Sequence, residues 1–182
     1  MNKSRCKWCN TNNPKYVEYH DKEWGQPKYN DQKILELLIL EMFQAGLSWE
    51  IILNKKEHFA KAFDNYDIWK IINYKEDAIT KLLNNKNIVR NRRKINATIN
   101  NSKIFLSIQK EWNSFANYIW HFTNNQIIYE TNKTHSKLSD LISKDLKSRG
   151  MKFVGTIIIY SFLQAIGIIY SHDKECFMYK HS

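Results

Sequence analysis

The apolar residues of this chain recur three and four positions apart, and this helical spacing limits the fold more than any other feature. It is clearest in ILELLILEMFQ, where we expect a helix from Asp31, its N-cap, to about Gly46, followed by a helix that Ser48 caps. Further helices are expected at about 67–73, 75–84, 91–109, 113–122, 136–148 and 154–170. No Pro/Gly/Ser-rich linker or internal repeat interrupts the pattern. The sequence therefore predicts one all-α domain over residues 1–182.

The charge balance restricts the partners of the chain. Lys and Arg number 28 against 18 Asp and Glu, and the net charge of +10 attracts polyanions such as nucleic acid or an acidic membrane surface. The uncharged run Phe153–Tyr170 has 18 residues, near the lower limit for a bilayer span, but its polar residues and the lack of a second span favour a buried helix. An amino terminus without an apolar signal segment and an odd count of three cysteines indicate a reducing cytoplasm.

A basic turn is expected between the helix that ends near Leu83 and the helix that carries Ile95. Such a helix, tight turn and helix can direct backbone N–H groups and cations at phosphate. A solvated basic face would show the same composition, and the patch alone does not separate the two interpretations. The five basic residues of the turn and its flanks are Lys86, Arg90, Arg92, Arg93 and Lys94.

Zinc-ligand residue types lie at both ends of the chain. The candidates are Cys6, Cys9, His20, His172 and Cys176. The last two are four residues apart and would share one face of a helix, if that segment is helical. Zinc takes four thiolate and imidazole ligands in closed structural sites, so five candidates compete for four places. The alternative is that the thiols are free and the histidines are ordinary.

Glu41 is the most informative carboxylate, because it lies on the same helical row as Ile34, Leu37 and Leu38 and should point inward. A buried unpaired carboxylate is costly, which indicates a partner, a ligand or a raised pKa. It could also be a core glutamate bonded to Tyr, Trp or a backbone amide. The aromatic residues of the amino-terminal third are either core or a slot for an extruded base. They are Trp8, Tyr16, Tyr19, Trp24, Tyr29 and Trp49.

Several segments, in order and with matching spacing over about residues 5–176, resemble the 3-methyladenine DNA glycosylase I family. They are YVEYHDKEWGQP, LEMFQAGLSW, NIVRNRRKI, SKDLKSRGMKFVGTIIIYSFLQAIGI and HDKEC. The resemblance implies a helix-hairpin-helix DNA glycosylase fold and a monofunctional enzyme of base excision repair. Its substrate would be double-stranded DNA that contains alkylated bases, from which it releases 3-methyladenine. A monomer in the bacterial cytoplasm is the default expectation, and the sequence indicates no protein partner.

The resemblance also implies the roles of individual residues. One structural zinc ion per chain would be bound by Cys6, His20, His172 and Cys176, which join the terminal segments 1–30 and 171–182 and leave Cys9 as a spare. Glu41 would be the catalytic residue that reads the adenine edge. Trp49 would stack on the base, and Tyr16 and Tyr19 would line the pocket, with Trp8 nearby. The turn NNKNIV lacks the glycine usual in helix-hairpin-helix proteins, so the DNA phosphates are assigned to Arg90, Arg92 and Arg93.

The resemblance implies a reaction that needs little acid–base catalysis. Helix-hairpin-helix glycosylases generally carry a catalytic aspartate, and this sequence shows no obvious candidate for it. Methylation at N3 makes adenine cationic, so the base leaves as a neutral molecule and needs little acid catalysis. Two other functions are considered: a zinc-bound DNA-binding module without activity, and a zinc hydrolase. Glu41 argues against the first, and a four-ligand Cys/His site argues against the second, because a hydrolase needs an open metal position.

Overall fold

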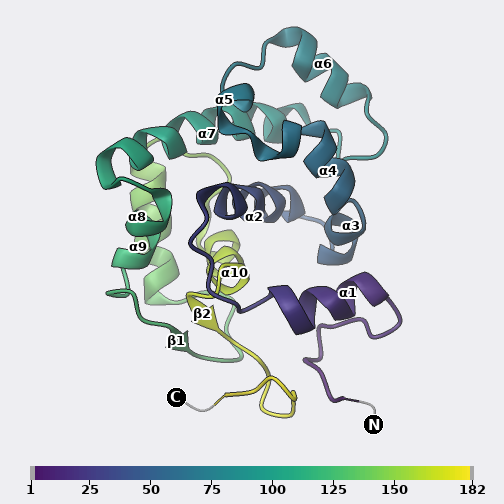
Figure 1. Ribbon diagram of the computed structural model, residues 1–182, viewed down its shortest axis with the longest axis vertical. Helices are drawn as coiled ribbons and strands as arrows, with labels where there is room; N and C mark the ends of the chain where they lie inside the picture. Colours follow the sequence, from purple (N-terminus) through teal and green to yellow (C-terminus); the bar gives the residue numbers. More distant parts are fainter. Residues whose placement is uncertain (1–2, 181–182) are drawn as a thin grey trace.

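The chain is mostly helical, in agreement with the predicted class, and the computed structural model describes residues 3–180 (Figure 1). Strands β1 and β2 form a small parallel pair, which the sequence pattern did not predict. The elements are α1 (Pro14–Glu18), the π-helical turn η1 (Tyr19–Glu23), α2 (Asp31–Gln44), α3 (Trp49–Asn54), α4 (Lys56–Ala62), η2 (Asp64–Tyr66), α5 (Ile68–Ile71), α6 (Glu76–Asn84), α7 (Arg92–Trp112), α8 (Phe115–His121), β1 (Ile128–Tyr129), α9 (Lys137–Ser148), α10 (Thr156–Ala165) and β2 (Ile169–Tyr170).

Helices α2 and α10 form the centre of the molecule, with α7, α8 and α9 packed around them (Figure 1). The uncharged run forms α10, but this helix ends at Ala165 and not at residue 170. Gly167 explains the early end: its φ is +79°, and a Cβ there would lie 2.4 Å from the backbone carbon of Gln26. None of the helices described for residues 3–180 combines the length and apolar character needed to cross a bilayer.

The predicted helix starts need two corrections. Asn30, not Asp31, is the N-cap of α2, and its side chain accepts a hydrogen bond from the Lys33 amide at 2.9 Å. Asp31 instead accepts from the amides of Phe115 and Ala116, both at 2.8 Å, and so caps α8. Ser48 does precede a helix but makes no side-chain capping bond, and the expected single helix is divided into α3 and α4 at Lys55.

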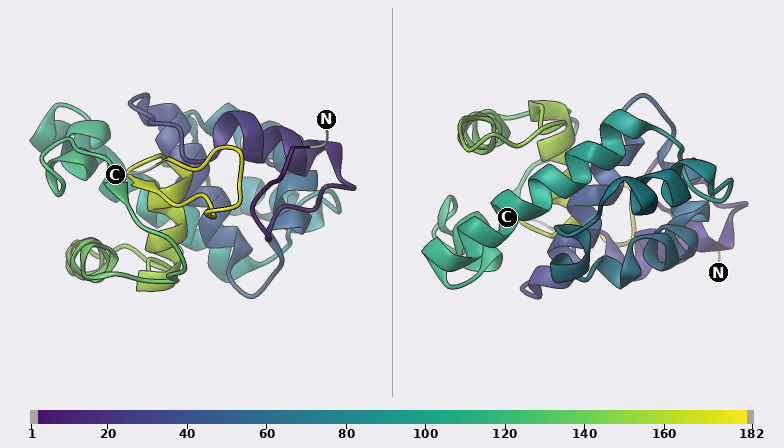
Figure 2. Two further views of the ribbon diagram at one scale, coloured as in Figure 1. Left: turned by 90° about the horizontal axis from the view of Figure 1, so that it is seen from below. Right: turned by 90° about the horizontal axis from the view of Figure 1, so that it is seen from above.

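Two helix–turn–helix units flank the core. The first joins α6 to α7 through residues 85–91, as the sequence predicted. The second joins α9 to α10 through residues 149–155, where Gly150 and Phe153 have left-handed φ angles of +95° and +55°. The two ends of the chain also meet, because the Phe177 amide donates a hydrogen bond to the Ser4 carbonyl at 2.9 Å. The right-hand view of Figure 2 shows α7 as the long teal helix that crosses the molecule.

Candidate functional site

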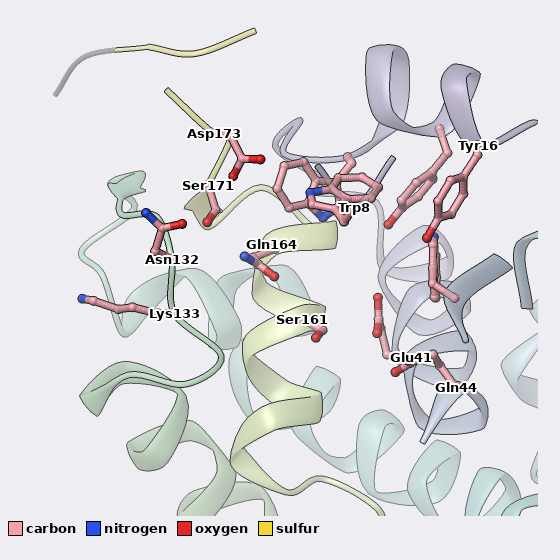
Figure 3. Close-up of a pocket in the computed structure, with 13 residues that line it drawn as sticks. Trp8, Tyr16, Glu41, Gln44, Asn132, Lys133, Ser161, Gln164, Ser171 and Asp173 are labelled. Atoms are coloured by element: carbon pink, nitrogen blue, oxygen red, sulfur yellow. The ribbon is translucent and has the colours of Figure 1, made fainter. Parts of the chain in front are cut away.

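A cavity of about 320 Å³ opens between the amino-terminal segment, α2 and α10 (Figure 3). Its aromatic walls are Trp8, Tyr16, Tyr19, Trp24 and Trp49. Its polar residues are Glu41, Gln44, Asn132, Lys133, Ser161, Gln164, Ser171 and Asp173. The fold thus brings together all five predicted pocket residues. Sequence reasoning could not identify the residues from α10, Ser161 and Gln164, because their exposure to the cavity depends on how α10 packs against α2.

Glu41 is buried, with 4% of its surface exposed, and points from α2 into this cavity (Figure 3). No side chain or amide of residues 3–180 forms a hydrogen bond or ion pair with it, so the alternative of a bonded core glutamate is not what the structure shows. Burial raises the pKa of Glu41 to about 8. The indole nitrogen of Trp49 is also buried and has no hydrogen-bond partner among the described residues. The Glu41 carboxyl group and the Trp49 indole N–H are therefore both without partners beside the cavity in the described part of the chain.

The aromatic rings of the wall meet edge-on or at a tilt. The ring centres of Trp8 and Trp24 are 4.7 Å apart with planes at 65°, and those of Tyr19 and Trp49 are 5.2 Å apart at 45°. In neither pair are the rings stacked in parallel, so neither ring covers the whole face of its neighbour. Burial raises the pKa of Tyr16 and of Tyr19, whose hydroxyl groups therefore remain donors. Such a cavity suits a flat, cationic, hydrogen-bonding ligand.

Cys6, His20, His172 and Cys176 form a second cluster, and all four are buried. Their ligand atoms lie within 4.8 Å of one another. The His172 Nδ1 is 3.4 Å from the Cys6 Sγ and 3.5 Å from the Cys176 Sγ, and the His20 Nε2 is 3.5 Å from the Cys176 Sγ. Residues 172–176 form a turn and not the helix that the four-residue spacing suggested. The cluster could hold a metal ion.

Cys9, the fifth ligand candidate, lies outside this cluster. Its thiol contacts the Tyr16 carbonyl at 3.8 Å. The cluster itself is fixed by Asp21, which accepts from His20 Nδ1 at 2.8 Å and from Arg5 Nη2 at 2.7 Å. Hydrogen bonding from Arg5, and then from His20, lowers the pKa of Asp21 to about 2. The Asp21 bond leaves His20 Nε2 to face the thiols, as in carboxylate–histidine–metal arrangements.

The metal-type cluster and the cavity share a wall. The Trp8 ring lies 5.3 Å from that of His20, and the Trp24 ring lies 4.7 Å from that of His172. Asp173 also contacts both regions, because it lines the cavity and its amide donates a hydrogen bond to the Cys6 Sγ at 3.3 Å, while its carboxylate accepts one from the Lys7 amide at 2.8 Å. The position of the cavity wall therefore depends on the order of the cluster beside it.

Only part of the predicted basic patch is exposed to solvent. Arg90, Arg92 and Arg93 are exposed at the start of α7, and Arg92 pairs with Glu76 at 2.7 Å. Arg90 and Arg93 form no ion pair with any residue in the described range 3–180. Lys94 is different, because only 6% of its surface is exposed. Four of the five basic residues of the patch thus remain available to a polyanion.

Comparison with known proteins gives consistent results. The model of the methyladenine glycosylase family matches residues 8–179. The chain is 38% identical over 181 residues to DNA-3-methyladenine glycosylase 1 of Escherichia coli (strain K12), covering 96% of each protein. A crystal structure of 3-methyladenine DNA glycosylase I superposes with a TM-score of 0.92 at 38% identity, over 97% of this chain and 100% of that one. A variant of such an enzyme in complex with 3-methyladenine gives 0.91 at 34% identity, over 98% and 99%.

Proposed function

The chain belongs to the methyladenine glycosylase family and excises 3-methyladenine from alkylated DNA in base excision repair, and we propose that Glu41 and the aromatic cavity perform this reaction. The observation that carries the proposal is Glu41 itself: a buried carboxyl group without a partner in residues 3–180, in a cavity lined by flat rings. A site that binds neutral or anionic groups gains nothing from such a residue. A cationic base supplies the missing partner.

The bound base interacts with the ring faces and with Glu41. Methylation at N3 gives adenine in DNA a positive charge, so the base leaves the sugar as a neutral molecule. The ring faces of Trp49 and Trp8 attract the cation, and Glu41 accepts hydrogen bonds from the base edge. In the free protein Glu41 holds its proton at neutral pH, because its pKa is about 8. A neighbouring positive charge lowers that pKa, so entry of the cationic base favours loss of the proton and formation of the carboxylate.

The cavity excludes bulk water around the glycosidic bond and leaves the hydrolytic water to be bound by polar wall residues. Asp173 is the second carboxylate of the wall, and the sequence argument had not singled it out. The Lys7 amide already fixes one of its oxygens. Because the leaving base needs no proton, positioning and electrostatic stabilisation supply most of the catalysis.

The test of this function is incubation of the purified chain with methylated DNA, followed by chromatography of the released bases. The wild type is expected to release free 3-methyladenine, and Glu41→Ala is expected to fold but to release none. Absence of release from a folded wild-type protein with an ordered metal cluster would instead support the DNA-binding module without activity.

One structural zinc ion fits the four-residue cluster. Zn–S bonds of about 2.3 Å and Zn–N bonds of about 2.0–2.1 Å in a tetrahedral site place S and N about 3.5 Å apart. The observed separations of 3.4 and 3.5 Å agree with that geometry. Four protein ligands leave no open position for water, so the ion would join segments 1–30 and 171–182 and support the cavity wall. It would take no part in a hydrolase reaction.

The zinc assignment is tested by metal content. Cys6→Ser is expected to lose bound zinc, and Cys9→Ser is expected to keep it, because Cys9 is outside the cluster. Zinc retained in full by Cys6→Ser would exclude Cys6 as a ligand.

Two segments with exposed or partly exposed backbone are suited to the DNA backbone. One is the start of α7, with Arg90, Arg92 and Arg93. The other is the hairpin at residues 149–155: the amides at the start of α10 lack a side-chain cap, and Gly155 has open space where a side chain would be. Gly155 has an ordinary φ of −64°, so neither backbone conformation nor internal packing requires glycine there. Close approach of a phosphate does. With these two turns, the proposed fold is that of a helix-hairpin-helix DNA glycosylase. The proposed protein is a single domain that acts as a monomer in the cytoplasm.

A further inference from the structure

Lys94, in the first turn of α7, is a buried cation without an acidic partner in the range 3–180. Its Nζ donates hydrogen bonds to the carbonyl oxygens of Phe43 at 2.8 Å and Ala45 at 2.7 Å. These carbonyls lie at the C-terminal end of α2, where the helix dipole favours a cation. The loop that starts there connects Gln44 to Trp49, and both residues line the cavity. Lys94 therefore attaches this loop to α7.

Asn101 makes a comparable attachment to a different segment. It is 3% exposed, donates to the Lys152 carbonyl at 2.8 Å and accepts from the Lys152 amide at 2.8 Å. The neighbouring Asn100 donates to the Gly150 carbonyl at 3.0 Å. These bonds hold the 149–155 hairpin, including its left-handed residue Phe153, against α7. Asn101 therefore fixes the second proposed DNA-contacting turn.

The two attachments lie on one face of a single rigid element. Lys94 and Asn101 are seven residues apart, which corresponds to two helical turns and an axial separation of about 10 Å. Helix α7 also begins at the basic turn, where the Asn91 side chain accepts a hydrogen bond from the Lys94 amide at 3.1 Å. The long helix in Figure 2 thus contacts the pocket loop, the hairpin and the basic turn.

We propose that Lys94 and Asn101 are positioning residues that fix the distance between the pocket loop and the DNA-contacting hairpin. The proposal rests on the function proposed above. A duplex held by the hairpin presents one nucleotide at a set distance, and the pocket must lie at that distance to receive it. Lys94 attaches the pocket loop to α7, and Asn101 attaches the hairpin to the same helix. An error of about 1 Å in such an arrangement can reduce a rate on the order of 100-fold.

The pocket residues also have supports other than the two attachments, although Lys94 bonds to the end of α2 and Asn101 contacts Met42 of that helix. Tyr19 packs on Trp49, and Glu41 is placed by the buried face of α2. Loss of either attachment should therefore slow excision from duplex DNA while the affinity for the free base is retained. A residue that only stabilises the fold would not separate these two quantities.

The experiment compares Lys94→Met, Asn101→Leu and their double variant with the wild type. Two quantities are measured at a temperature where all variants are folded: single-turnover excision from methylated duplex DNA, and affinity for free 3-methyladenine from tryptophan fluorescence. The matched control is Thr98→Val, which removes a buried hydrogen bond from the Thr98 hydroxyl to the Lys94 carbonyl in the same helix, while the Thr98 side chain makes no hydrogen bond to either segment within residues 3–180. If either variant fails to fold, Lys94→Gln or Asn101→Asp replaces it, since each keeps part of the attachment.

Each single variant is expected to lose on the order of 10- to 100-fold in excision from duplex DNA. Affinity for the free base should stay within about threefold, and Thr98→Val should resemble the wild type. The double variant should be little worse than the poorer single one, because loss of either attachment already leaves the spacing between the pocket loop and the hairpin unfixed. Unchanged excision, an equal loss of free-base affinity, or multiplicative losses in the double variant would overturn the proposal. A wild type without excision would instead contradict the proposed function.

Discussion

The two halves of α2 treat their carboxylates in opposite ways. In the first half, Glu36 accepts from Lys33 at 2.9 Å and lies 3.8 Å from Lys56, which also pairs with Glu23 at 2.6 Å. In the second half, Glu41 is more deeply buried and has no partner in residues 3–180. The cation nearest to the end of this helix, Lys94, bonds to carbonyl oxygens instead. The fold can pair its carboxylates, so an unpaired one at the cavity indicates a ligand and not a shortage of cations.

The largest expected effect separates these two glutamates by activity. Glu41→Gln should reduce excision of 3-methyladenine on the order of 100- to 1000-fold, because it removes the charge that faces the cationic base. Glu36→Gln should stay within about twofold of the wild type, since its partners are lysines outside the cavity. Single-turnover assays on methylated DNA measure both. Equal effects of the two substitutions would end the distinction.

The second effect concerns stability against pH. The folded-state pKa of Glu41, about 8, lies above the ordinary value of 4.5, so the unfolded chain loses this proton first as pH rises. The free energy of unfolding is therefore lowered by Glu41 as the pH rises. This destabilisation is absent below about pH 4.5 and grows until the pH passes 8. Glu41→Gln removes it and should be more stable than the wild type by roughly 4 kcal/mol at pH 8, and by less than about 1 kcal/mol at pH 5. Urea titrations at the two pH values measure this. A pH-independent difference would show that the carboxyl is not buried as described.

The smallest effect extends the comparison to cations. Arg92 is paired with Glu76, whereas Arg90 and Arg93 have no ion-pair partner in residues 3–180. Each phosphate contact contributes about 0.9 to the slope of log affinity against log salt. Arg90→Gln with Arg93→Gln should therefore reduce that slope by up to about 1.8, and Arg92→Gln should reduce it less. If the slope is the same in all variants, these arginines do not contact DNA.

Residue spacing revealed those features that depend on a single helix. Glu41 could be found because its inward direction follows from the row it shares with Ile34 and Leu38. The metal-type cluster depended on a family resemblance, since spacing alone left Cys6 and Cys9 equivalent. Only the fold separates these two thiols, by placing Cys9 against the Tyr16 carbonyl.

The features that sequence reasoning missed depend on contacts between distant segments. Asp31 was assigned to the nearest helix, but it caps α8 about 85 residues away. Helix α10 was predicted to be too long, because the approach of Gln26 to Gly167 is a tertiary contact. Lys94 was grouped with surface cations, although the end of α2 covers it. In each case a contact with a distant segment overrode the expectation from the local pattern.

The most direct test of the account is the pH dependence of single-turnover excision at subsaturating protein, for the wild type and for Glu41→Gln. A cationic base must replace the proton on Glu41, so the wild-type kcat/KM should rise about tenfold per pH unit below pH 8 and level off above it. Glu41→Gln should give a low profile without this rise. Parallel profiles for the two proteins would contradict the claim that the unpaired carboxyl of Glu41 recognises the charged base.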